Sequence, residues 1–470
     1  MTKPEAPDEV CWIAQTLEEV GFETWTVGGA VRDALFGIPS EDWDLTTRAT
    51  PAEVKRVFGR TIPIGIDHGT VGVLSRDGVL YEVTTFRRDI ETTGRRAVVE
   101  FSDTLDEDLA RRDFTINAVA WHPLREVFHD PFDGKADLKR GVLRTVGDPG
   151  DRFTEDYLRI LRALRFAGAY QLTIERKTWL GLTASVHRMD ILSPERLREE
   201  LERVLTGETP PSRSIALYAA SGVLGFLYPE LDVLVDFPRE PGSDWFAHSL
   251  RAIDLLSPRR PVLRWAALFQ GAGEHEGYPG AGEEGTEPHD LALRRSTAVL
   301  ERLRSSNAIV SEVPGLTQWI ARPPEPEASD EELRRWLSAV GRNTLNSLLR
   351  IWIACLRADE VCVGSLTRSQ FMELCRRLRA ISQSAVPLTV AELGVSGRDL
   401  IRMGYAPGPH FGEVLDHLLD RTLEDPSLNQ PALLQAEIQE WMQHKESHRR
   451  DHEDPRKRDP GSSFKTGTLP

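Results

Sequence analysis

The sequence predicts an α/β (α+β) N-terminal part with a small mixed sheet, followed by an all-α remainder. Short apolar runs that suit strands alternate with helix starts over residues 1–142, and an Asp-Gly turn joins two of these runs. Later in the chain the apolar residues recur at helical spacing. At 470 residues and 40% hydrophobic content, the chain is long enough for several domains with cores.

A pair of glycines lies between the first predicted strand and the helix that follows it. The run Trp25–Val27 predicts a strand that leads into Gly28 and Gly29, and a helix follows over Val31–Phe36. Paired glycines let the backbone approach a ligand closely, and the free N–H groups of a helix start favour anions. Arg32, one turn into the helix, is placed to add a charge-assisted contact to a triphosphate. We therefore predict a phosphate-binding turn here.

A second strand is predicted over Asp42–Thr46. Side chains at positions i and i+2 of a strand point the same way, so Asp42 and Asp44 can share a metal site. Carboxylates suit Mg²⁺, which takes its other ligands from water and substrate phosphates. Two such ions, roughly 3.5–4 Å apart, clamp the attacking and leaving oxygens of a displacement. Each motif alone is commonly a turn or a solvated loop, but their order and spacing together indicate nucleotidyl transfer.

Two further elements are predicted beside these strands. A capping box at Thr50–Glu53 starts a helix that runs through Phe58. The runs Gly69–Leu74 and Val79–Thr84, joined by the Asp-Gly turn, predict a hairpin. Glu82 is then a candidate third carboxylate, and the alternative is an ordinary exposed strand residue, because alternation alone does not fix its face.

These motifs carry a family resemblance. The stretches Gly28–Gly37 (GGAVRDALFG) and Asp42–Thr47 (DWDLTT) resemble the head signature of the class II tRNA nucleotidyltransferase and bacterial poly(A) polymerase family. Three further segments extend the likeness through about residue 205, and a weaker likeness continues to about residue 440. The resemblance implies Mg²⁺-dependent transfer of CMP and AMP from CTP and ATP to the 3′ end of tRNA, with release of pyrophosphate.

Alternatives remain open at this point. An enzyme that adds only A, or a bacterial poly(A) polymerase, shares the same head motifs, although the acidic net charge favours a tRNA enzyme. A non-catalytic RNA-binding protein is the alternative from a different functional class. Such a protein would tolerate loss of the carboxylates, and their presence in this chain favours an enzyme.

The segment Arg111–Ala118 resembles the ribose-reading motif of the family. The resemblance assigns Arg112, Asp113 and Asn117 to nucleotide binding, where a carboxylate and a guanidinium together satisfy sugar hydroxyls and phosphates. The alternative is a salt-bridged helix start.

The helix predicted over Glu155–Ala167 offers the means of choosing a base. Asp156 can accept from an exocyclic amino group while Arg159 donates to the adjoining ring nitrogen, which fits cytosine and adenine. Uracil and guanine present a carbonyl at that place, which the carboxylate repels. Arg162 and Arg165 would hold Asp156 or the triphosphate. The alternative is a surface helix with ion pairs at spacing i, i+3.

Residues 87–96 are polar, charged and aperiodic, which predicts a flexible loop. In family members that add a terminal adenosine, a loop at this place helps to switch specificity. This chain retains a loop, although its Asp89–Arg96 stretch departs from the usual aspartate- and glycine-rich form.

The expected parts are a catalytic head at 1–142, a helical neck with base recognition at 143–206, a helical body at 207–321, a helical tail that binds tRNA at 322–443, and a disordered charged end at 444–470. The charged helix Pro194–Leu205 receives no catalytic role. The body resembles a degenerate His-Asp phosphohydrolase, because His248 and His289 are present while Gln270-Gly271 stands where the central His-Asp pair belongs. An insertion over 271–288 is expected to be disordered.

Composition limits the remaining possibilities. The net charge of −15 requires any RNA site to be a local patch. Cysteines 11, 355, 362 and 375 show neither zinc-type spacing nor a disulfide scaffold and are expected to be buried thiols. No membrane-length apolar run or signal-peptide core is present, so we expect a cytoplasmic protein without a membrane partner. The sequence leaves the oligomeric state open.

Overall fold

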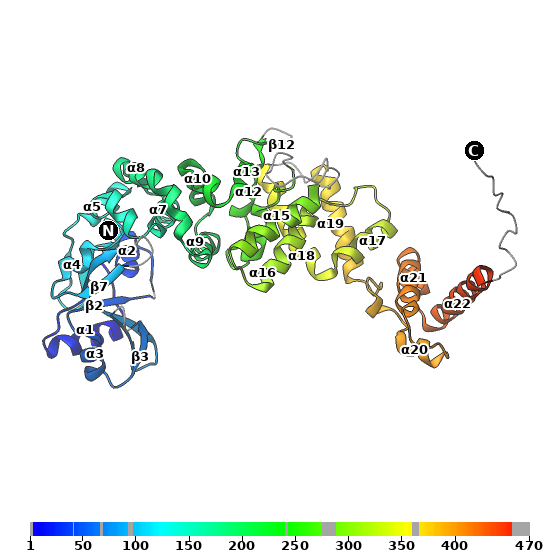
Figure 1. The fold of residues 1–470 in the computed structure, drawn as a ribbon, viewed down its shortest axis with the longest axis horizontal. Helices are drawn as coiled ribbons and strands as arrows, with labels where there is room; N and C mark the ends of the chain where they lie inside the picture. The colour runs from blue at the N-terminus through cyan, green and yellow to red at the C-terminus, as the bar shows by residue number, and fades with distance from the viewer. Residues whose placement is uncertain are drawn as a thin grey trace, which may run out of the picture. The chain divides into compact units, whose positions relative to one another are not determined.

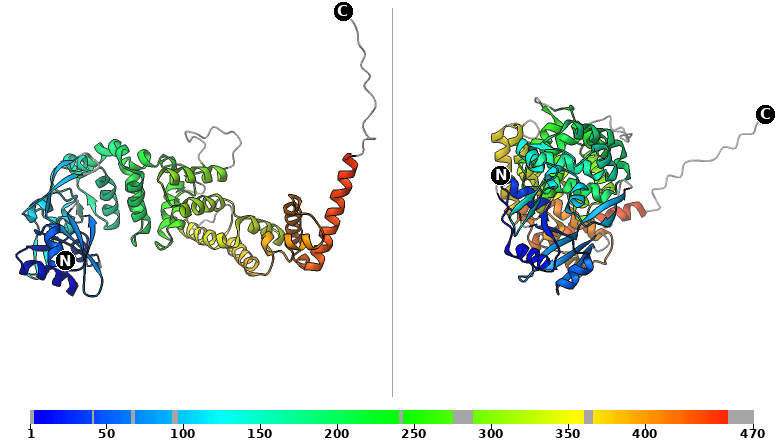
Figure 2. Two further views of the ribbon diagram at one scale, coloured as in Figure 1. Left: turned by 60° about the horizontal axis from the view of Figure 1, so that its bottom comes forward. Right: turned by 90° about the vertical axis from the view of Figure 1, so that its left-hand side faces the viewer.

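The structure is a computed structural model that describes residues 3–40, 42–65, 69–92, 97–239, 243–274, 288–359 and 366–453. The chain divides into two compact units, one of residues 1–321 with 353–360 and one of residues 322–352 with 361–470. The main sheet belongs to the first unit, in the blue and cyan part of the chain (Figures 1 and 2). The expected boundaries between head, neck and body lie inside this unit and stay predictions.

A seven-stranded mixed sheet forms the N-terminal part, in the order β3-β4-β5-β2-β1-β8-β9. Its strands β2 and β5 run parallel, and the other neighbouring pairs run antiparallel. The strands are β1 (Thr24–Val27), β2 (Asp44–Thr47), β3 (Thr61–Gly65), β4 (Thr70–Leu74), β5 (Leu80–Thr85), β8 (Ala120–His122) and β9 (Val127–His129). The small mixed sheet and the predicted hairpin, now β4 and β5, are both confirmed.

Alternation along β5 separates the two faces of the sheet. Tyr81 and Val83 are buried, while Leu80 and Glu82 are exposed. Helix α3 (Pro51–Val57) packs against β4 and β5, and α1 (Asp8–Glu19) packs against β1 and α3. The capping box predicted for α3 is present. Because these strands bury one side, the polar side chains of β5 are left on the other side.

The remaining elements of the first unit are mainly helices. They are α2 (Gly29–Phe36), β6 (Arg87–Thr92), β7 (Ala97–Phe101), α4 (Leu105–Ala110), η2 (Thr115–Asn117), α5 (Gly134–Arg140), β10 (Val142–Leu143), α6 (Pro149–Glu155), α7 (Leu158–Ala169), β11 (Thr173–Ile174), α8 (Arg176–Ser185), η3 (Val186–Ile191), α9 (Pro194–Thr206), α10 (Ser212–Ser221), α11 (Val223–Leu227), α12 (Pro229–Asp232), β12 (Pro238–Arg239), β13 (Ser243–Asp244), α13 (Trp245–Asp254), α14 (Pro261–Leu268), α15 (Pro288–Arg302) and α16 (Asn307–Ile320).

The second unit is helical in its described residues. Its elements are α17 (Asp330–Val340), the first part of α18 (Arg342–Asp359), α19 (Arg368–Gln383), η4 (Val390–Glu392), α20 (Gly397–Arg402), α21 (His410–Glu424), η5 (Pro426–Leu428) and α22 (Pro431–Glu453). Leu400, Val414, Leu418 and Leu434 contribute to one core cluster there. None of the helices in the described ranges combines the length and apolar character needed to span a membrane.

Three predicted elements differ from the structure near the site. Helix α2 begins at Gly29, two residues earlier than predicted, and β2 begins only at Asp44, so Asp42 precedes the strand. The helix predicted over Glu155–Ala167 is interrupted, since α6 ends at Glu155 and α7 begins at Leu158. Asp156 has extended backbone angles, and its Oδ1 accepts from the backbone N–H of Leu158 at 3.0 Å. This side-chain contact competes with the helical hydrogen bond and breaks the helix.

The loop predicted over residues 87–96 is wrong for its first part. Residues 87–92 form β6, which pairs with β7 in a two-stranded antiparallel ribbon. Charged residues dominate β6, so its sequence lacks apolar alternation, and one of them makes a cross-strand contact, Arg88 Nε to Glu100 Oε2 at 3.0 Å. Residues 93–96 lie outside the described residues.

The structure also bears on predictions for parts of the chain outside the site. Helix α22 extends to Glu453, so the disorder predicted from 444 is wrong for residues 444–453, while 454–470 lie outside the described residues. Most of the predicted insertion and Cys362 also lie outside them. Cys355 and Cys375 are buried thiols as predicted, whereas Cys11 is only half-buried.

The His-Asp-like segment contains a histidine that is hydrogen-bonded to a carboxylate. His248 on α13 is buried and shares a hydrogen bond with Asp359, which Arg239 and Arg251 also contact. Burial lowers the pKa of His248 to about 4, which keeps its ring neutral at pH 7. Gln270 donates to Ser249 and accepts from Cys355. These contacts are typical of a packed structural element. The resemblance of this segment to a His-Asp phosphohydrolase stays a prediction.

Candidate active site

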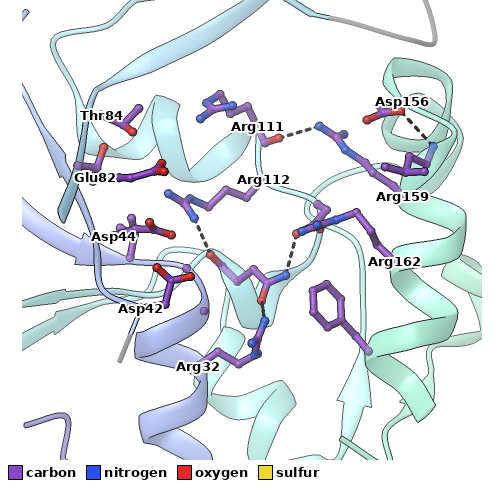
Figure 3. A pocket seen from close by; sticks show the side chains of 18 of the residues that line it. Arg32, Asp42, Asp44, Glu82, Thr84, Arg111, Arg112, Asp156, Arg159 and Arg162 are labelled. Atoms are coloured by element: carbon purple, nitrogen blue, oxygen red, sulfur yellow. Dashed lines mark hydrogen bonds and ion pairs between the residues drawn. The ribbon is translucent and has the colours of Figure 1, made fainter. Parts of the chain in front are cut away.

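A pocket of about 810 Å³ lies within the first unit, and it brings together every site residue predicted from the sequence (Figure 3). Strands β2 and β5 line one side, and helices α7 and α9 line another. The predicted residues at the pocket are Gly28, Gly29, Arg32, Asp42, Asp44, Glu82, Arg112, Asp113, Asn117, Asp156, Arg159, Arg162 and Arg165.

The carboxylates stand on adjacent strands. In the parallel pairing of β2 with β5, Leu45 lies opposite Val83, so the preceding residues Asp44 and Glu82 occupy neighbouring positions on the open face. Asp42 comes two residues before Asp44, with buried Trp43 between them, so both aspartates point to the pocket (Figure 3). The sheet register thus answers a question that the sequence left open, namely which face Glu82 occupies.

These acidic groups repel one another. Burial first, and then the charges of Asp42 and Glu82, raise the pKa of Asp44 to about 6, while Arg112 acts in the opposite direction. A divalent cation between the carboxylates would relieve this repulsion, so the donor set fits Mg²⁺. Among the described residues, no three acidic, His or Cys side chains are grouped closely enough to hold a metal ion by themselves. Mg²⁺ commonly completes its shell with water and substrate phosphates.

The glycine turn lies beside these carboxylates, at a position where a side chain would be crowded. Gly28 has a φ of 77°, which a residue with a side chain rarely adopts. A Cβ there would stand 3.3 Å from Arg112 Nη1 and 3.5 Å from Asp44 Oδ2. The turn therefore combines an unusual backbone conformation with a crowded position, and the N-terminus of α2 follows at Gly29.

Arg32 is held by a network of contacts across the site. Its guanidinium donates to Asn117 Oδ1 at 2.9 Å and to the Tyr170 hydroxyl at 2.7 Å, and it bonds Asp33. The ring of Tyr170 lies 4.6 Å from the guanidinium carbon. Arg32 is largely buried, so its geometry is fixed before any ligand binds.

Arg112 is anchored by a buried carboxylate. Its Nη2 donates to Asp108 Oδ2 at 3.3 Å, and its Nη1 donates to the carbonyl of Asn117 at 3.3 Å. Asp108 also accepts from Arg111 Nε at 3.1 Å, and the adjacent arginines keep its pKa low despite burial, which acts to raise it. Asp108 thereby fixes Arg112 beside Asp44 and Gly28, where a phosphate would bind.

Asp113 is saturated by internal contacts. It accepts from Asn117 Nδ2 at 2.9 Å and from Arg162 Nε at 2.7 Å, and it is buried. Burial acts to raise its pKa, but Arg162 and Asn117 prevail and lower it to about 2. Asp113 therefore contacts both Arg162 and Asn117, and its direct contact with a sugar stays a prediction.

Asp156 and Arg159 both reach the pocket, but each has another partner. Arg196 of α9 donates to Asp156 Oδ2 at 2.6 Å. Arg159 bonds Glu155 and donates to the carbonyl of Arg111 at 3.1 Å. The two side chains are thus separately fixed on one side of the pocket, as a hydrogen-bond acceptor and a donor (Figure 3).

Sequence reasoning missed several residues of this site. Those that line the pocket or hold its arginines are Asp108, Arg111, Tyr170, Arg196, Glu200 and Arg203. Glu200 is almost wholly buried and bonds Arg165 and Arg203, at 2.8 and 2.9 Å. The dense charge of α9 was the available sequence signal, and it did not distinguish Glu200 from its exposed neighbours.

Comparison with known proteins places these features in context. Residues 24–144 match the family described as Poly A polymerase head domain. Residues 171–234 match the family described as probable RNA and SrmB-binding site of polymerase A. The two matched regions together contain most of the pocket residues, and the segment between them contains Asp156 and Arg159.

Full-length relatives are also found. A CCA-adding enzyme of Leuconostoc mesenteroides is 44% identical over 437 residues, covering 92% of this chain and 95% of the relative. A CCA-adding enzyme of Levilactobacillus brevis is 33% identical over 429 residues, covering 90% and 96%. The crystal structure of the Bacillus stearothermophilus CCA-adding enzyme in complex with CTP superposes with a TM-score of 0.69, at 29% identity and 94% coverage of this chain and 100% of that one.

Proposed function

The chain belongs to the family of CCA-adding enzymes, the class II tRNA nucleotidyltransferases, and from this premise we propose that it transfers CMP and AMP from CTP and ATP to the 3′ end of tRNA. Pyrophosphate is the other product. One observation carries the proposal: a single pocket joins the carboxylates Asp42, Asp44 and Glu82 to the acceptor and donor pair Asp156 and Arg159.

The carboxylate side of the pocket performs the transfer in this proposal. Asp42 and Asp44 would hold Mg²⁺, with Glu82 beside them, and a cation bound there would lower the pKa of the RNA 3′-hydroxyl and neutralise charge on the phosphate. The backbone N–H groups at the start of α2 and the guanidinium of Arg112 face the place of the triphosphate. Asp108 keeps Arg112 in that orientation.

The opposite side of the pocket selects the base. Asp156 accepts from the amino group that cytosine and adenine share, and Arg159 donates to the adjoining ring nitrogen. Arg196 and Glu155 keep these two side chains apart and pre-oriented, so little rearrangement accompanies nucleotide binding. The protein then acts as the template in the cytoplasm, and residues 322–443 are proposed to hold the tRNA body.

The test uses purified protein with tRNA transcripts that end before CCA, after C and after CC, each with one NTP at a time. We expect CTP to be used by the first two ends and ATP by the third. Use of ATP alone on the CC end, with no use of CTP, would identify an A-adding enzyme. Long A tracts on any RNA would identify a poly(A) polymerase, which the match to a polymerase head domain makes the second candidate. Absence of all transfer would leave a non-catalytic RNA-binding protein.

A further inference from the structure

An exposed aliphatic surface continues the catalytic face of the sheet beyond Glu82. Ile62, Ile64 and Leu80, on β3 and β5, are 41%, 44% and 42% exposed. Between them lies Gly72 of β4, and a Cβ placed there would stand 2.6 Å from Ile64 Cδ1 and 2.8 Å from Leu80 Cδ1. We call Ile62, Ile64 and Leu80 the aliphatic shelf, since their side chains flank a glycine whose missing side chain keeps the surface flat.

The register places this shelf on the same face as the catalytic carboxylates. Gly72 lies directly opposite Glu82 in the antiparallel pairing of β4 with β5. Thr70 and Thr84, opposite each other one step further along, both line the pocket, and their hydroxyls are 3.0 Å apart. Because side chains alternate along strands, Leu80 shares the face of Glu82 and Thr84. The shelf is therefore continuous with the pocket.

The order of strands places the shelf on the side of the carboxylates that is away from the triphosphate. Asp44 and Glu82 lie on β2 and β5, whereas the glycine turn that faces the triphosphate follows β1, on the far side of β2 from β5. An in-line displacement requires the attacking hydroxyl and the departing pyrophosphate on opposite sides of the α-phosphate. The RNA end therefore approaches from the side of β4 and β3, where the shelf lies.

We propose that the aliphatic shelf seats the terminal base of the RNA 3′ end, so that the 3′-hydroxyl is directed at the carboxylates. This inference rests on the proposed function. The chemistry fits a nucleobase, because its flat apolar face packs on aliphatic side chains while its phosphates stay in water. Exposed apolar side chains clustered beside a polar pocket also mark a binding surface more often than isolated ones do.

The test replaces the shelf without adding charge near the carboxylates. The double variant Ile64→Ser/Leu80→Ser is compared with Val127→Ser, an equally exposed position at 46% on β9, the opposite edge of the same sheet. We expect the KM for tRNA ending in CC to rise about tenfold in ATP addition by the double variant. Its dissociation constant for CTP alone should stay within about twofold of that of the wild-type chain, which also reports an intact pocket. Val127→Ser and the conservative Leu80→Met should behave as wild type.

Each other outcome counts against the shelf. An unchanged KM for tRNA in the double variant, with an active wild-type enzyme, overturns the inference and leaves the proposed function standing. A wild-type chain that adds nothing to tRNA overturns the proposed function first. A wild-type dimer in sedimentation that the double variant converts to a monomer would make the shelf an interface between copies of the chain, and would likewise overturn its assignment to RNA.

Discussion

Arg162 donates from Nε to Asp113 Oδ2 at 2.7 Å, and this ion pair joins the segment after α4 to helix α7. The segment carries Arg112, which faces the carboxylates, while α7 carries Arg159, which faces the proposed base site. The Asp113 side chain is 8% exposed and that of Arg162 is 31% exposed, so the pair connects the two halves of the pocket from a largely buried carboxylate.

Loss of this pair is expected to destabilise the protein. Asp113→Ala removes the acceptor of Arg162 and of the Asn117 amide, and leaving such donors unsatisfied costs about 1–3 kcal/mol. Thermal unfolding at pH 7 should show a clearly lower midpoint. Asp151→Ala, an exposed aspartate on α6, is the control. Equal midpoints for the two variants would mean that the ion pair contributes nothing to stability.

The Asp113–Arg162 pair should make the stability of the protein fall as the pH is lowered. The pKa of Asp113 is lowered to about 2 from an ordinary value of 3.8, so its stabilisation is complete above about pH 4 and is lost as the pH falls towards 2. The midpoint gap between wild type and Asp113→Asn should therefore shrink between pH 5 and pH 2.5, as thermal scans at both values would show. A gap that is the same at both values would contradict the assignment.

The substitution Asp44→Asn should abolish nucleotide addition while stabilising the metal-free protein. The pKa of Asp44 is raised to about 6, so above that pH its charge opposes folding by an upper bound of about 3 kcal/mol. The variant should lose nucleotide addition, keep tRNA affinity, and unfold at a higher temperature than wild type in the absence of divalent metal. Mg²⁺ should raise the midpoint of the wild type but not of the variant. Retained addition by Asp44→Asn or by Asp42→Ala would remove the metal assignment.

Activity should fall on the acid side as Asp44 is protonated. Asp44 is half-protonated near pH 6 in the metal-free protein, because its pKa is raised to about 6. A bound cation favours the ionised form, so the acid limb should move to lower pH as Mg²⁺ is increased. Initial rates from pH 5 to 8 at low and high Mg²⁺ measure this shift. An acid limb that does not respond to Mg²⁺ would point to another titrating group.

Arg196 offers a test of a partner that the sequence did not reveal. Arg196→Ala removes the donor to Asp156 Oδ2, so the carboxylate loses its fixed orientation, and the KM for CTP and ATP should rise about tenfold. Arg198→Ala, two residues along the same helix and outside the pocket, is the matched control. Equal nucleotide KM values in the two variants would remove the positioning role of Arg196.

How much the sequence predicted depends on the range of each interaction. The glycine turn, the aspartate pair and the hairpin were predictable because each depends on neighbours within a few residues. The break at Asp156 was not, since helical periodicity continues through it and only the side-chain contact to Leu158 reveals it.

Long-range partners were beyond sequence reasoning for a physical reason. Arg196 meets Asp156 across 40 residues, and Tyr170 meets Arg32 across 138, and no local pattern encodes either contact. The charge of α9 resembled a solvated face because Glu200, its buried carboxylate, is indistinguishable in sequence from exposed neighbours. The same holds for Asp113, whose contacts with Arg162 and Asn117 the motif alone does not reveal.

In the proposed function Asp156 selects the base, and the nucleotide selectivity of Asp156→Ala tests this role most directly. Single additions to tRNA ending in C are measured with CTP and UTP, and to tRNA ending in CC with ATP and GTP. Removal of the carboxylate should lower the preference for CTP over UTP and for ATP over GTP by about tenfold or more, because repulsion of the carbonyl is lost. Selectivity equal to that of the wild-type enzyme, in a variant that still adds nucleotides, would contradict the account.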